Sequence, residues 1–466
     1  MPLVLRRIPR IHEARRQVVG GLFSCPERLA DLLPLREERF VMAGMAGTQL
    51  EGAGQGEAFD AAFMRRALEL AARGAGHTNP NPLVGAVIVR DGRVIGEGWH
   101  ACYGQEHAER RALADCATRG EDPRGATVYV TLEPCAHHGK QPPCADALVE
   151  AGVARVVVGS RDPNPLVAGK GNARLREAGI EVTVDVLRDE CDAINQVFFR
   201  YIMSRKPYVV AKWAMTADGR IACASGDARW VTGPAAREDG HALRNRLAAI
   251  MVGAGTVAAD DPLLTCRLPG GRNPLRVVCD THLALAEDCA LVRSAEAGEA
   301  PLLVACGEAA GEVAEKAVRL RARGVEVLEL ALDAAGHVDL AAVLEALGAR
   351  GVDSVLLEGG ARLHGSAFAA GLVDEVVAYV APKILGDPAA PGPVAGLAPA
   401  VMGEAVHFGA PHVDVLGDDV RLCWRVGHAA DTHAAAALPC LACGPLYPGG
   451  ATTAQHVSES LVKAGE

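Results

Sequence analysis

The stretch GATVYVTLEPCAHHGKQPPCADALVEAGVARVVVGS, residues 125–160, decides the fold of the first half of this chain. It opens with an apolar, β-branched run at 125–133 and continues with a loop that contains two Pro-Cys pairs. A helical pattern at 144–152 and a second apolar run at 155–160 follow. A strand, a helix and a further strand in this order are typical of a parallel α/β unit.

The alternation extends outward from this stretch on both sides. Apolar residues at helical spacing predict a helix from Phe59 to its cap at Gly74, and two β-rich runs around Asp91-Gly92 predict a hairpin. Downstream, a helix is expected at 171–179 and a strand at 180–187, and a helix from Asp189 to about Ser204 closes the unit.

A second α/β alternation starts at residue 207. Strands are predicted at 208–215, 249–253, 275–279, 301–305, 325–330, 353–358, 374–380 and 418–427, and helices at 234–247, 310–323, 339–350 and 361–371. We therefore expect an extension over 1–56 that is poorly ordered, α/β domains over 57–204 and 207–427, and a loose tail over 428–466.

Composition narrows the class of protein. The 466 residues carry a formal net charge of −10 and only 4% aromatic residues, which argues against a nucleic-acid partner. The sequence contains no run of eighteen apolar residues that would predict a membrane span. Residues 1–30 lack the pattern of a secretory signal. The 14 Cys form no spaced disulfide framework, so we expect a cytoplasmic enzyme and leave a homo-oligomer open.

Four residues around the quoted stretch predict a zinc centre. His107 and Glu109 lie at the start of a helical run, and Cys135 and Cys144 flank the loop after the strand. A catalytic zinc takes three protein ligands and keeps one position for water, and one His with two thiolates supplies three. Glu109, beside a ligand, is placed to carry a proton to a leaving amine.

This pattern is close to the signature of zinc nucleobase deaminases, His-x-Glu with Pro-Cys-x-x-Cys. It differs in the gap between Cys135 and Cys144, which holds eight residues instead of two. The competing interpretation is a set of core Cys and a surface His. Cys102 and Cys116 fall outside the pattern and are expected to be buried apolar residues.

A specific resemblance covers most of the chain, from about 59 to 426. The segments NPNPLVGAVIV, HAE, TLEPCAHHGKQPPC, GSRDPNPLVAGKG, LEGGARLHGS and YVAPKILG resemble the bifunctional riboflavin-biosynthesis family, a pyrimidine deaminase fused to a pyrimidine reductase. The long zinc loop is similar to that of the family. The resemblance implies a cytidine-deaminase-like zinc domain followed by a dihydrofolate-reductase-like α/β domain that uses NADPH.

The resemblance also implies roles for individual residues of the first domain. It places one zinc on His107, Cys135 and Cys144, makes Glu109 the proton carrier, and has Asn81, His137 and Lys140 contact a phosphorylated pyrimidine substrate. Arg110 stands where the family usually has an apolar residue, which puts the local packing in question.

In the second domain the resemblance implies two further groups of contacts. It places substrate contacts at Arg244, Leu264, Arg267 and Glu358, and cofactor contacts at Ala214, Trp230, Thr256, Asp260, Gly360, Ala361, Arg362, Leu363, His364, Gly365 and Ser366. Ala228 replaces a Ser of the family that touches substrate.

Physical chemistry supports part of this assignment. Arg244 and Arg267 suit a fork for the ribose phosphate, and the backbone N–H groups after Glu358 suit a cofactor phosphate at a helix start. Lys212, Asp260 and Glu358 are candidates for handling protons near the reduced carbon.

The reactions implied are zinc-dependent deamination of a diamino-pyrimidinone ribosylamino phosphate and NADPH-dependent reduction of the product's ribosyl group to ribityl. Two alternatives stay open on the residues alone. One is a deaminase of a free base, nucleoside or tRNA with a scaffold as its second half. The other is a non-catalytic binding protein that zinc stabilises. The Cys440-x-x-Cys443 motif is a weak indication of a metal site, because it offers two ligands and no second pair accompanies them.

Overall fold

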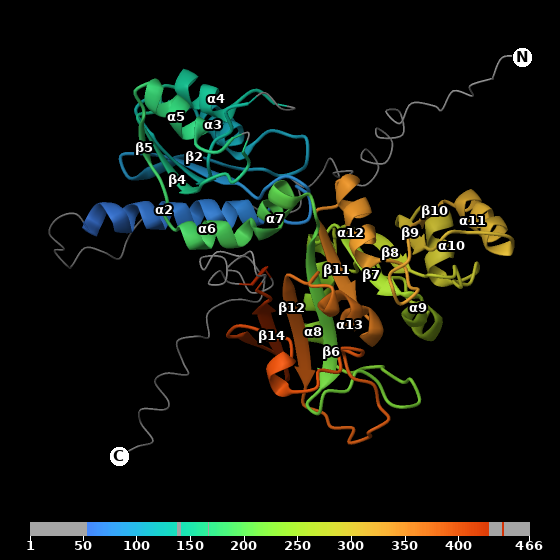
Figure 1. Ribbon diagram of the computed structural model, residues 1–466. Helices are drawn as coiled ribbons and strands as arrows, with labels where there is room; N and C mark the ends of the chain where they lie inside the picture. Colours follow the sequence, from blue (N-terminus) through green and yellow to red (C-terminus); the bar gives the residue numbers. More distant parts are fainter. Residues whose placement is uncertain (1–53, 138–140, 166, 428–439, 442–466) are drawn as a thin grey trace, which may run out of the picture. The chain divides into compact units, whose positions relative to one another are not determined.

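The computed structural model describes residues 54–137, 141–165, 167–427, 440 and 441 (Figure 1). They form two compact units, with the boundary between Arg188 and Asp189. Both units are α/β, as the sequence predicts. Within the described ranges, every helix is too short or too polar to span a bilayer.

The first unit is built on a five-stranded sheet with the order β2-β1-β3-β4-β5. Its strands are β1 (Gly85–Arg90), β2 (Arg93–Trp99), β3 (Thr127–Leu132), β4 (Arg155–Ser160) and β5 (Glu181–Thr183). β1 and β2 form the predicted hairpin, and Asp91 and Gly92 in its turn have φ values of 52° and 74°. β3, β4 and β5 are parallel, whereas β1 is antiparallel to β3.

Helices cover both faces of this sheet. They are α2 (Gly54–Ala72), α3 (Ala108–Thr118), α4 (Cys144–Glu150) and α5 (Lys170–Glu177). Figure 1 shows α2 on one face and α3, α4 and α5 on the other. Ile88, Val130 and Val158 alternate with residues of the opposite face and join the core under α3 to α5. This packing brings the amino-terminal ends of α3 and α4 next to the carboxyl end of β3.

The second unit has a nine-stranded sheet with the order β10-β9-β8-β7-β11-β6-β12-β14-β13. Its strands are β6 (Tyr208–Thr216), β7 (Ala249–Gly253), β8 (Leu275–Cys279), β9 (Leu302–Cys306), β10 (Val325–Glu329), β11 (Ser354–Glu358), β12 (Glu375–Ala381), β13 (His412–Leu416) and β14 (Asp419–Arg425). Strands β6 to β12 are parallel neighbours, and the β13–β14 hairpin adds an antiparallel edge. β7, β11 and β6 lie next to each other, so their carboxyl ends define one edge of the sheet where a ligand site is expected.

The helices of the second unit are α6 (Arg188–Ile194), α7 (Gln196–Ser204), α8 (Pro234–Arg246), α9 (Ala254–Asp260), α10 (Ala290–Glu296), α11 (Glu312–Ala322), α12 (Leu340–Ala349) and α13 (Ala361–Ala369), with a short 3₁₀ turn η2 (Met402–Glu404). The predicted strands and the four predicted helices are present. α9 and α10 were not predicted, because each is short and lacks a clear apolar period. β13 was not predicted either; it is a five-residue edge strand whose Val413 and Val415 are exposed.

The segment after Arg188 differs from the expectation in two ways. It forms two helices, α6 and α7, and both group with the second unit, whereas one helix was expected to close the first. A contact of α7 explains this grouping: the Tyr201 hydroxyl donates to the Gly348 carbonyl of the second unit at 3.0 Å. Tyr201 is buried by this contact, so the helix belongs to the core of the second unit.

The two ends of the chain also differ from the expectation. α2 begins at Gly54, inside the segment expected as an extension, and residues 1–53 lie outside the described part. Cys440 and Leu441 were expected in a loose tail, but both are buried in the core of the second unit. The Leu441 amide donates to Glu375 at 2.7 Å, and Arg246 donates to the Leu441 carbonyl at 2.8 Å. Cys440 is thus a docked apolar residue, and Cys443 lies outside the described residues.

This docking predicts different results for two truncations. A chain that ends at residue 441 should keep the free energy of unfolding of the full chain. A chain that ends at 428 should lose roughly 1.5–3 kcal/mol of it, because the pocket that Leu441 fills would become exposed. Denaturant unfolding of the two truncated chains measures the difference. Equal free energies of unfolding would show that the contacts of Leu441 do not stabilise the second unit.

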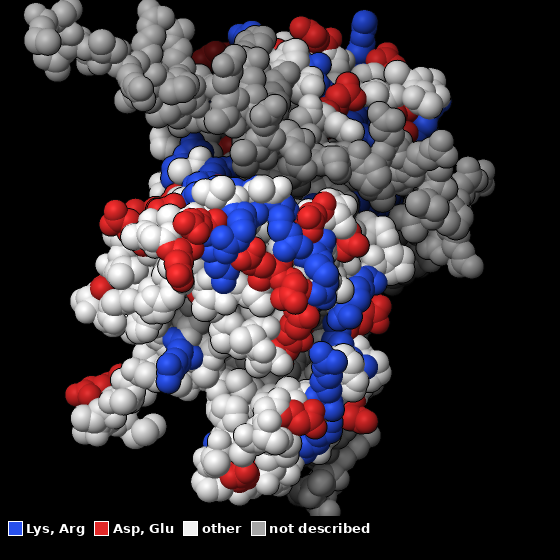
Figure 2. Space-filling view, turned by 90° about the vertical axis from the view of Figure 1, so that its right-hand side faces the viewer, with Lys and Arg blue, Asp and Glu red and all other residues white. Residues whose placement is uncertain are grey.

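Charges on the face shown in Figure 2 are mixed, with Lys and Arg interspersed among Asp and Glu. In the second unit, ion pairs join neighbouring elements, such as Arg319 with Glu287 at 2.9 Å and Arg323 with Glu296 at 2.6 Å. This face therefore presents no unbroken basic surface of the kind that binds a nucleic-acid backbone.

Candidate functional site

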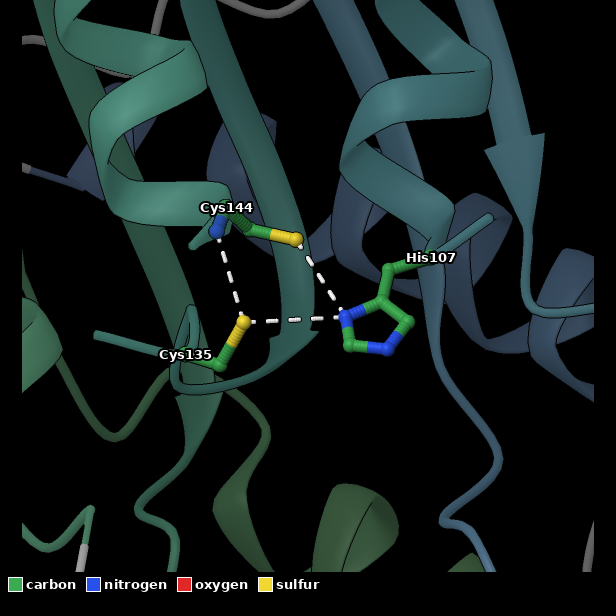
Figure 3. A group of neighbouring side chains, drawn as sticks. All are labelled: His107, Cys135 and Cys144. Carbon is green, nitrogen blue, oxygen red and sulfur yellow. Dashed lines mark hydrogen bonds between the residues drawn. The ribbon is translucent and has the colours of Figure 1, made fainter. Parts of the chain in front are cut away.

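Three side chains of the first unit converge on one point (Figure 3). His107 is the residue before α3, Cys135 follows β3, and Cys144 is the first residue of α4. The His107 Nδ1 atom lies 3.6 Å from the Cys135 sulfur and 3.4 Å from the Cys144 sulfur. Among the described residues, no other group of three His, Cys, Asp or Glu side chains has its potential ligand atoms all within 4.8 Å of one another.

The chemistry of these donors fits zinc. A hydrogen bond from the Cys144 thiol, with a further one from His107, lowers the pKa of Cys135 to about 4. The Cys144 backbone amide also donates to the Cys135 sulfur, at 3.3 Å. The thiolate is the form that binds a metal, and one imidazole with two sulfurs is a ligand set of catalytic zinc.

Glu109 lies in the first turn of α3, next to this centre. Its side chain is only 3% exposed, and burial raises the pKa of its carboxyl group, although the charge of His107 acts in the opposite direction. A buried carboxyl group with a raised pKa can both accept and return a proton near neutral pH. Glu109 therefore has the environment that the predicted role requires.

Zinc analysis of cysteine variants tests the ligand set. Cys135→Ser and Cys144→Ser should each reduce zinc from one per chain to near zero and lower the unfolding temperature, because metal binding stabilises the folded loop. Cys116→Ala is the matched control, since Cys116 is fully buried in the core and away from the three donors. Retention of full zinc by both serine variants would contradict the assignment.

The predicted substrate contacts of the first unit have different surroundings. The Asn81 amide lies 3.2 Å from His100 Nε2, and His100 Nδ1 lies 3.1 Å from the Glu106 carbonyl, directly before the ligand His107. His137 is exposed, and Lys140 lies outside the described residues. The sequence did not indicate a role for His100, whose ring joins the segment of Asn81 to that of Glu106.

A second missed residue, Glu133, ties two loops together at the metal centre. Its buried carboxylate accepts hydrogen bonds from the amides of Gly169 and Gly171, at 3.1 and 3.0 Å. A Cβ atom at Gly171 would lie 1.8 Å from the Pro134 carbonyl oxygen, so only glycine fits there. The segments TLEPC and GSRDPNPLVAGKG thus meet in space.

Arg110, whose packing the sequence left in question, has a defined place. It donates to the carbonyl groups of Pro142 and Pro143, each at 3.3 Å, and so contacts the chain directly before Cys144. The charged side chain therefore joins α3 to the end of the metal loop instead of packing in the core.

The second unit contains a pocket of about 310 Å³ at the carboxyl ends of β6, β7 and β11. The predicted residues that line it are Ala214, Trp230, Arg244, Thr256, Asp260, Leu264, Arg267, Glu358, Gly360 and His364. Ala361, Arg362, Leu363, Gly365 and Ser366 continue into α13 and do not line it. Ala228 also lines the pocket. Its methyl group cannot form the hydrogen bond that a serine at this position would make.

A largely buried ion triad, whose side chains are 13–16% exposed, forms one wall of this pocket. Glu358 accepts from Lys212 Nζ at 2.8 Å and from Arg244 Nε at 2.9 Å. Burial acts to raise the pKa of Glu358, but the charges of Arg244 and Lys212 outweigh it and hold the pKa well below the usual range. Glu358 therefore stays a carboxylate, which makes Lys212 the better proton donor of the two. Asp260 is exposed and stands apart from the triad.

The residues after Glu358 suit the phosphate-bearing end of a cofactor. Gly359 and Gly360 have φ values of 108° and 91°, which side chains rarely adopt, and a Cβ atom at Gly359 would lie 3.2 Å from the Thr256 side chain. The turn brings the amino-terminal end of α13 to the pocket, where free amide groups favour an anion. Together with the pocket, this turn fits NADPH.

The comparisons with known proteins match both domains. The cytidine and deoxycytidylate deaminase zinc-binding region matches residues 57–160, and the RibD C-terminal domain matches residues 207–422. The chain is 46% identical to the riboflavin biosynthesis protein RibD of Actinobacillus pleuropneumoniae over 79% of this chain and 95% of that protein. Identity to RibD of Escherichia coli is 41%, over 71% and 89% of the two chains.

Solved structures give the same result for the fold. Acinetobacter baumannii RibD aligns with a TM-score of 0.71 and 38% identity, over 80% of this chain and all of that one. A deaminase/reductase from Thermotoga maritima, named for diaminohydroxyphosphoribosylaminopyrimidine and 5-amino-6-(5-phosphoribosylamino)uracil, aligns with a TM-score of 0.70 and 37% identity, over 80% and 100%. These alignments cover most of this chain and nearly all of each relative, and the chain belongs to the RibD family of riboflavin biosynthesis proteins.

Proposed function

We propose that this chain deaminates 2,5-diamino-6-(ribosylamino)-4(3H)-pyrimidinone 5'-phosphate in its first domain and reduces 5-amino-6-(5-phosphoribosylamino)uracil in its second. The observation that carries the proposal is the presence of two separate sites in one member of the RibD family. One is the His107, Cys135 and Cys144 cluster with buried Glu109, and the other is the pocket with the Lys212, Glu358 and Arg244 triad. We place the domains at 57–204 and 207–427, with 189–204 packed on the second.

In the first site, His107, Cys135 and Cys144 would hold zinc, which supplies activation of a water molecule when bound. Glu109 takes a proton from that water and returns it to the leaving amino group, a role that its burial and raised pKa support. Asn81, His137 and Lys140 orient the pyrimidine and its phosphorylated sugar. The ligand set itself contains no acidic residue, so Glu109 is the group whose loss should stop proton transfer.

In the second site, the residues from Gly360 to Ser366 with Ala214, Trp230, Thr256 and Asp260 would hold NADPH, which supplies hydride when bound. Arg244, Leu264, Arg267 and Glu358 contact the substrate. Arg244 has two of its nitrogens bonded to Glu358 and the Thr265 carbonyl, so Arg267 is the freer cation for the ribose phosphate. Lys212, held by Glu358, is the proposed proton donor to the opening sugar.

The partner is a small phosphorylated pyrimidine, and we place the enzyme in the cytoplasm.

Mass spectrometry of the diamino substrate incubated with the protein tests both halves of the proposal at once. Without NADPH, the product should show exchange of an amino group for oxygen and nothing further. With NADPH, the same product should gain two hydrogens. Turnover of cytidine or guanine in place of this substrate would support a free-base or nucleoside deaminase instead.

A further inference from the structure

The loop that carries Arg267 is fastened to the end of α8. Arg244 donates to the Thr265 carbonyl at 3.1 Å, and the Arg272 amide donates to the Asn245 side chain at 2.7 Å. Within the loop, the Cys266 amide donates to Asn273 at 2.9 Å. The backbone on both sides of Arg267 is therefore fixed by groups other than the Arg267 side chain.

The Arg267 side chain has one bond of its own, to His241 on α8. Its Nε–H donates to His241 Nε2 at 3.1 Å, and both residues line the pocket of the second unit. Among the described residues, no other group bonds the Arg267 guanidinium. His241 lies three residues before Arg244, so the two side chains project from the same face of α8. No role for His241 was expected from the sequence.

The bond fixes the protonation state of His241. Arginine Nε always carries its hydrogen, so His241 Nε2 must accept, and the neutral ring then carries its own hydrogen on Nδ1. Burial is the largest cause that lowers the pKa of His241 to about 4, and the charges of Arg244 and Arg267 lower it further. The charge of Lys212 also lowers the pKa of His241, and only the charge of Glu358 raises it. The ring is thus uncharged at neutral pH and available as an acceptor.

We propose that His241 is a positioning residue that holds Arg267 by its Nε and leaves both terminal amino groups for the anionic group of the substrate. The inference rests on the proposed reductase function and on Arg267 as its phosphate contact. An unbound arginine side chain samples many rotamers, and binding would otherwise have to remove this entropy. A neutral acceptor at Nε fixes the side chain in advance without competing for the terminal groups.

Two substitutions in the full-length protein separate this role from simple packing. His241→Leu keeps apolar volume but offers no acceptor, so the KM for the phosphorylated aminouracil should rise roughly tenfold, as for a lost charge-assisted hydrogen bond. The kcat, the KM for NADPH and the rate of ammonia release should stay unchanged. His241→Gln offers an amide oxygen at similar reach and should restore most of the low KM. A Gln variant no better than the Leu variant would overturn the proposal.

The phosphate and Arg267 provide the decisive controls. The penalty of His241→Leu should vanish with a substrate that lacks the phosphate, and it should vanish in an Arg267→Leu background. Persistence of the penalty in either case would show that His241 acts by another route. Arg267→Leu alone should raise the KM, and a normal KM for that variant would instead refute Arg267 as a substrate contact.

A substitution at Arg267 keeps the test independent of any folding defect at 241. In Arg267→Lys, a single ammonium group cannot bond His241 and the phosphate from the same positions as a guanidinium. Lys keeps the positive charge but not the held Nε, so the KM of this variant should rise at least as far as that of His241→Leu. A Lys variant with the KM of the unmodified protein would show that a held Nε is not needed.

Discussion

Replacing Glu109 by Gln should lower the rate of ammonia release from the diamino substrate by roughly a hundred- to ten-thousandfold, the range of a lost general acid–base. Gln keeps the size of the side chain and a hydrogen-bonding group, but it cannot take up and return a proton. The buried position of Glu109 and its raised pKa are the features that this substitution removes. Ammonia release measured with saturating substrate reports the loss.

Two controls make the result specific. The Glu109→Gln protein should retain its zinc, because Glu109 is not one of the three converging donors. Glu150→Gln, on the exposed end of α4, makes the same chemical change away from the site and should leave ammonia release unchanged. A Glu109→Gln variant that keeps its zinc and still deaminates at the normal rate would rule out Glu109 as the proton carrier.

The second large effect is expected at the ion triad of the reductase pocket. Glu358→Gln removes the charge that balances Lys212 and Arg244, so both cations lose their partner in a buried site. NADPH oxidation with the supplied aminouracil should fall at least roughly tenfold, and stability should fall by roughly 3–5 kcal/mol. NADPH absorbance and denaturant unfolding measure the two effects.

Ammonia release should survive in the Glu358→Gln protein, because the zinc site lies in the other unit. Glu345→Gln is the matched control, since Glu345 pairs with Lys206 at 3.1 Å on the exposed surface, where an ion pair contributes little. Normal NADPH oxidation by a folded Glu358→Gln protein would show that the triad has no part in reduction.

The metal centre could be predicted from the sequence because its chemistry is local. His107 and Glu109 are neighbours at one helix start, and both Cys follow Pro around one loop, so residue type and spacing alone indicated the ligand set. Parallel strands such as β8 (Leu275–Cys279) and β9 (Leu302–Cys306) were predictable for the same reason, since each is a continuous buried run.

What the sequence did not reveal depends on contacts between distant segments. His241 gains its role from Arg267, which lies 26 residues away, and Glu133 gains its role from amides more than 30 residues away. α7 showed a helical pattern, but only its contacts with distant residues assign it to the second unit, such as the bond from Tyr201 to Gly348 and the ion pair of Arg200 with Asp374. Cys440 and Leu441 are buried anchors in an Ala- and Pro-rich segment that no periodic pattern marks.

The central claim is that one chain carries two catalytic sites that work independently. The most direct test supplies the folded, zinc-loaded Glu109→Gln protein with the deaminated intermediate and NADPH, and follows the absorbance of NADPH. We predict oxidation at the rate of the unmodified protein, while ammonia release from the diamino substrate stays at its reduced level. Loss of NADPH oxidation in this folded variant would contradict the division of the chain into two independent catalytic domains.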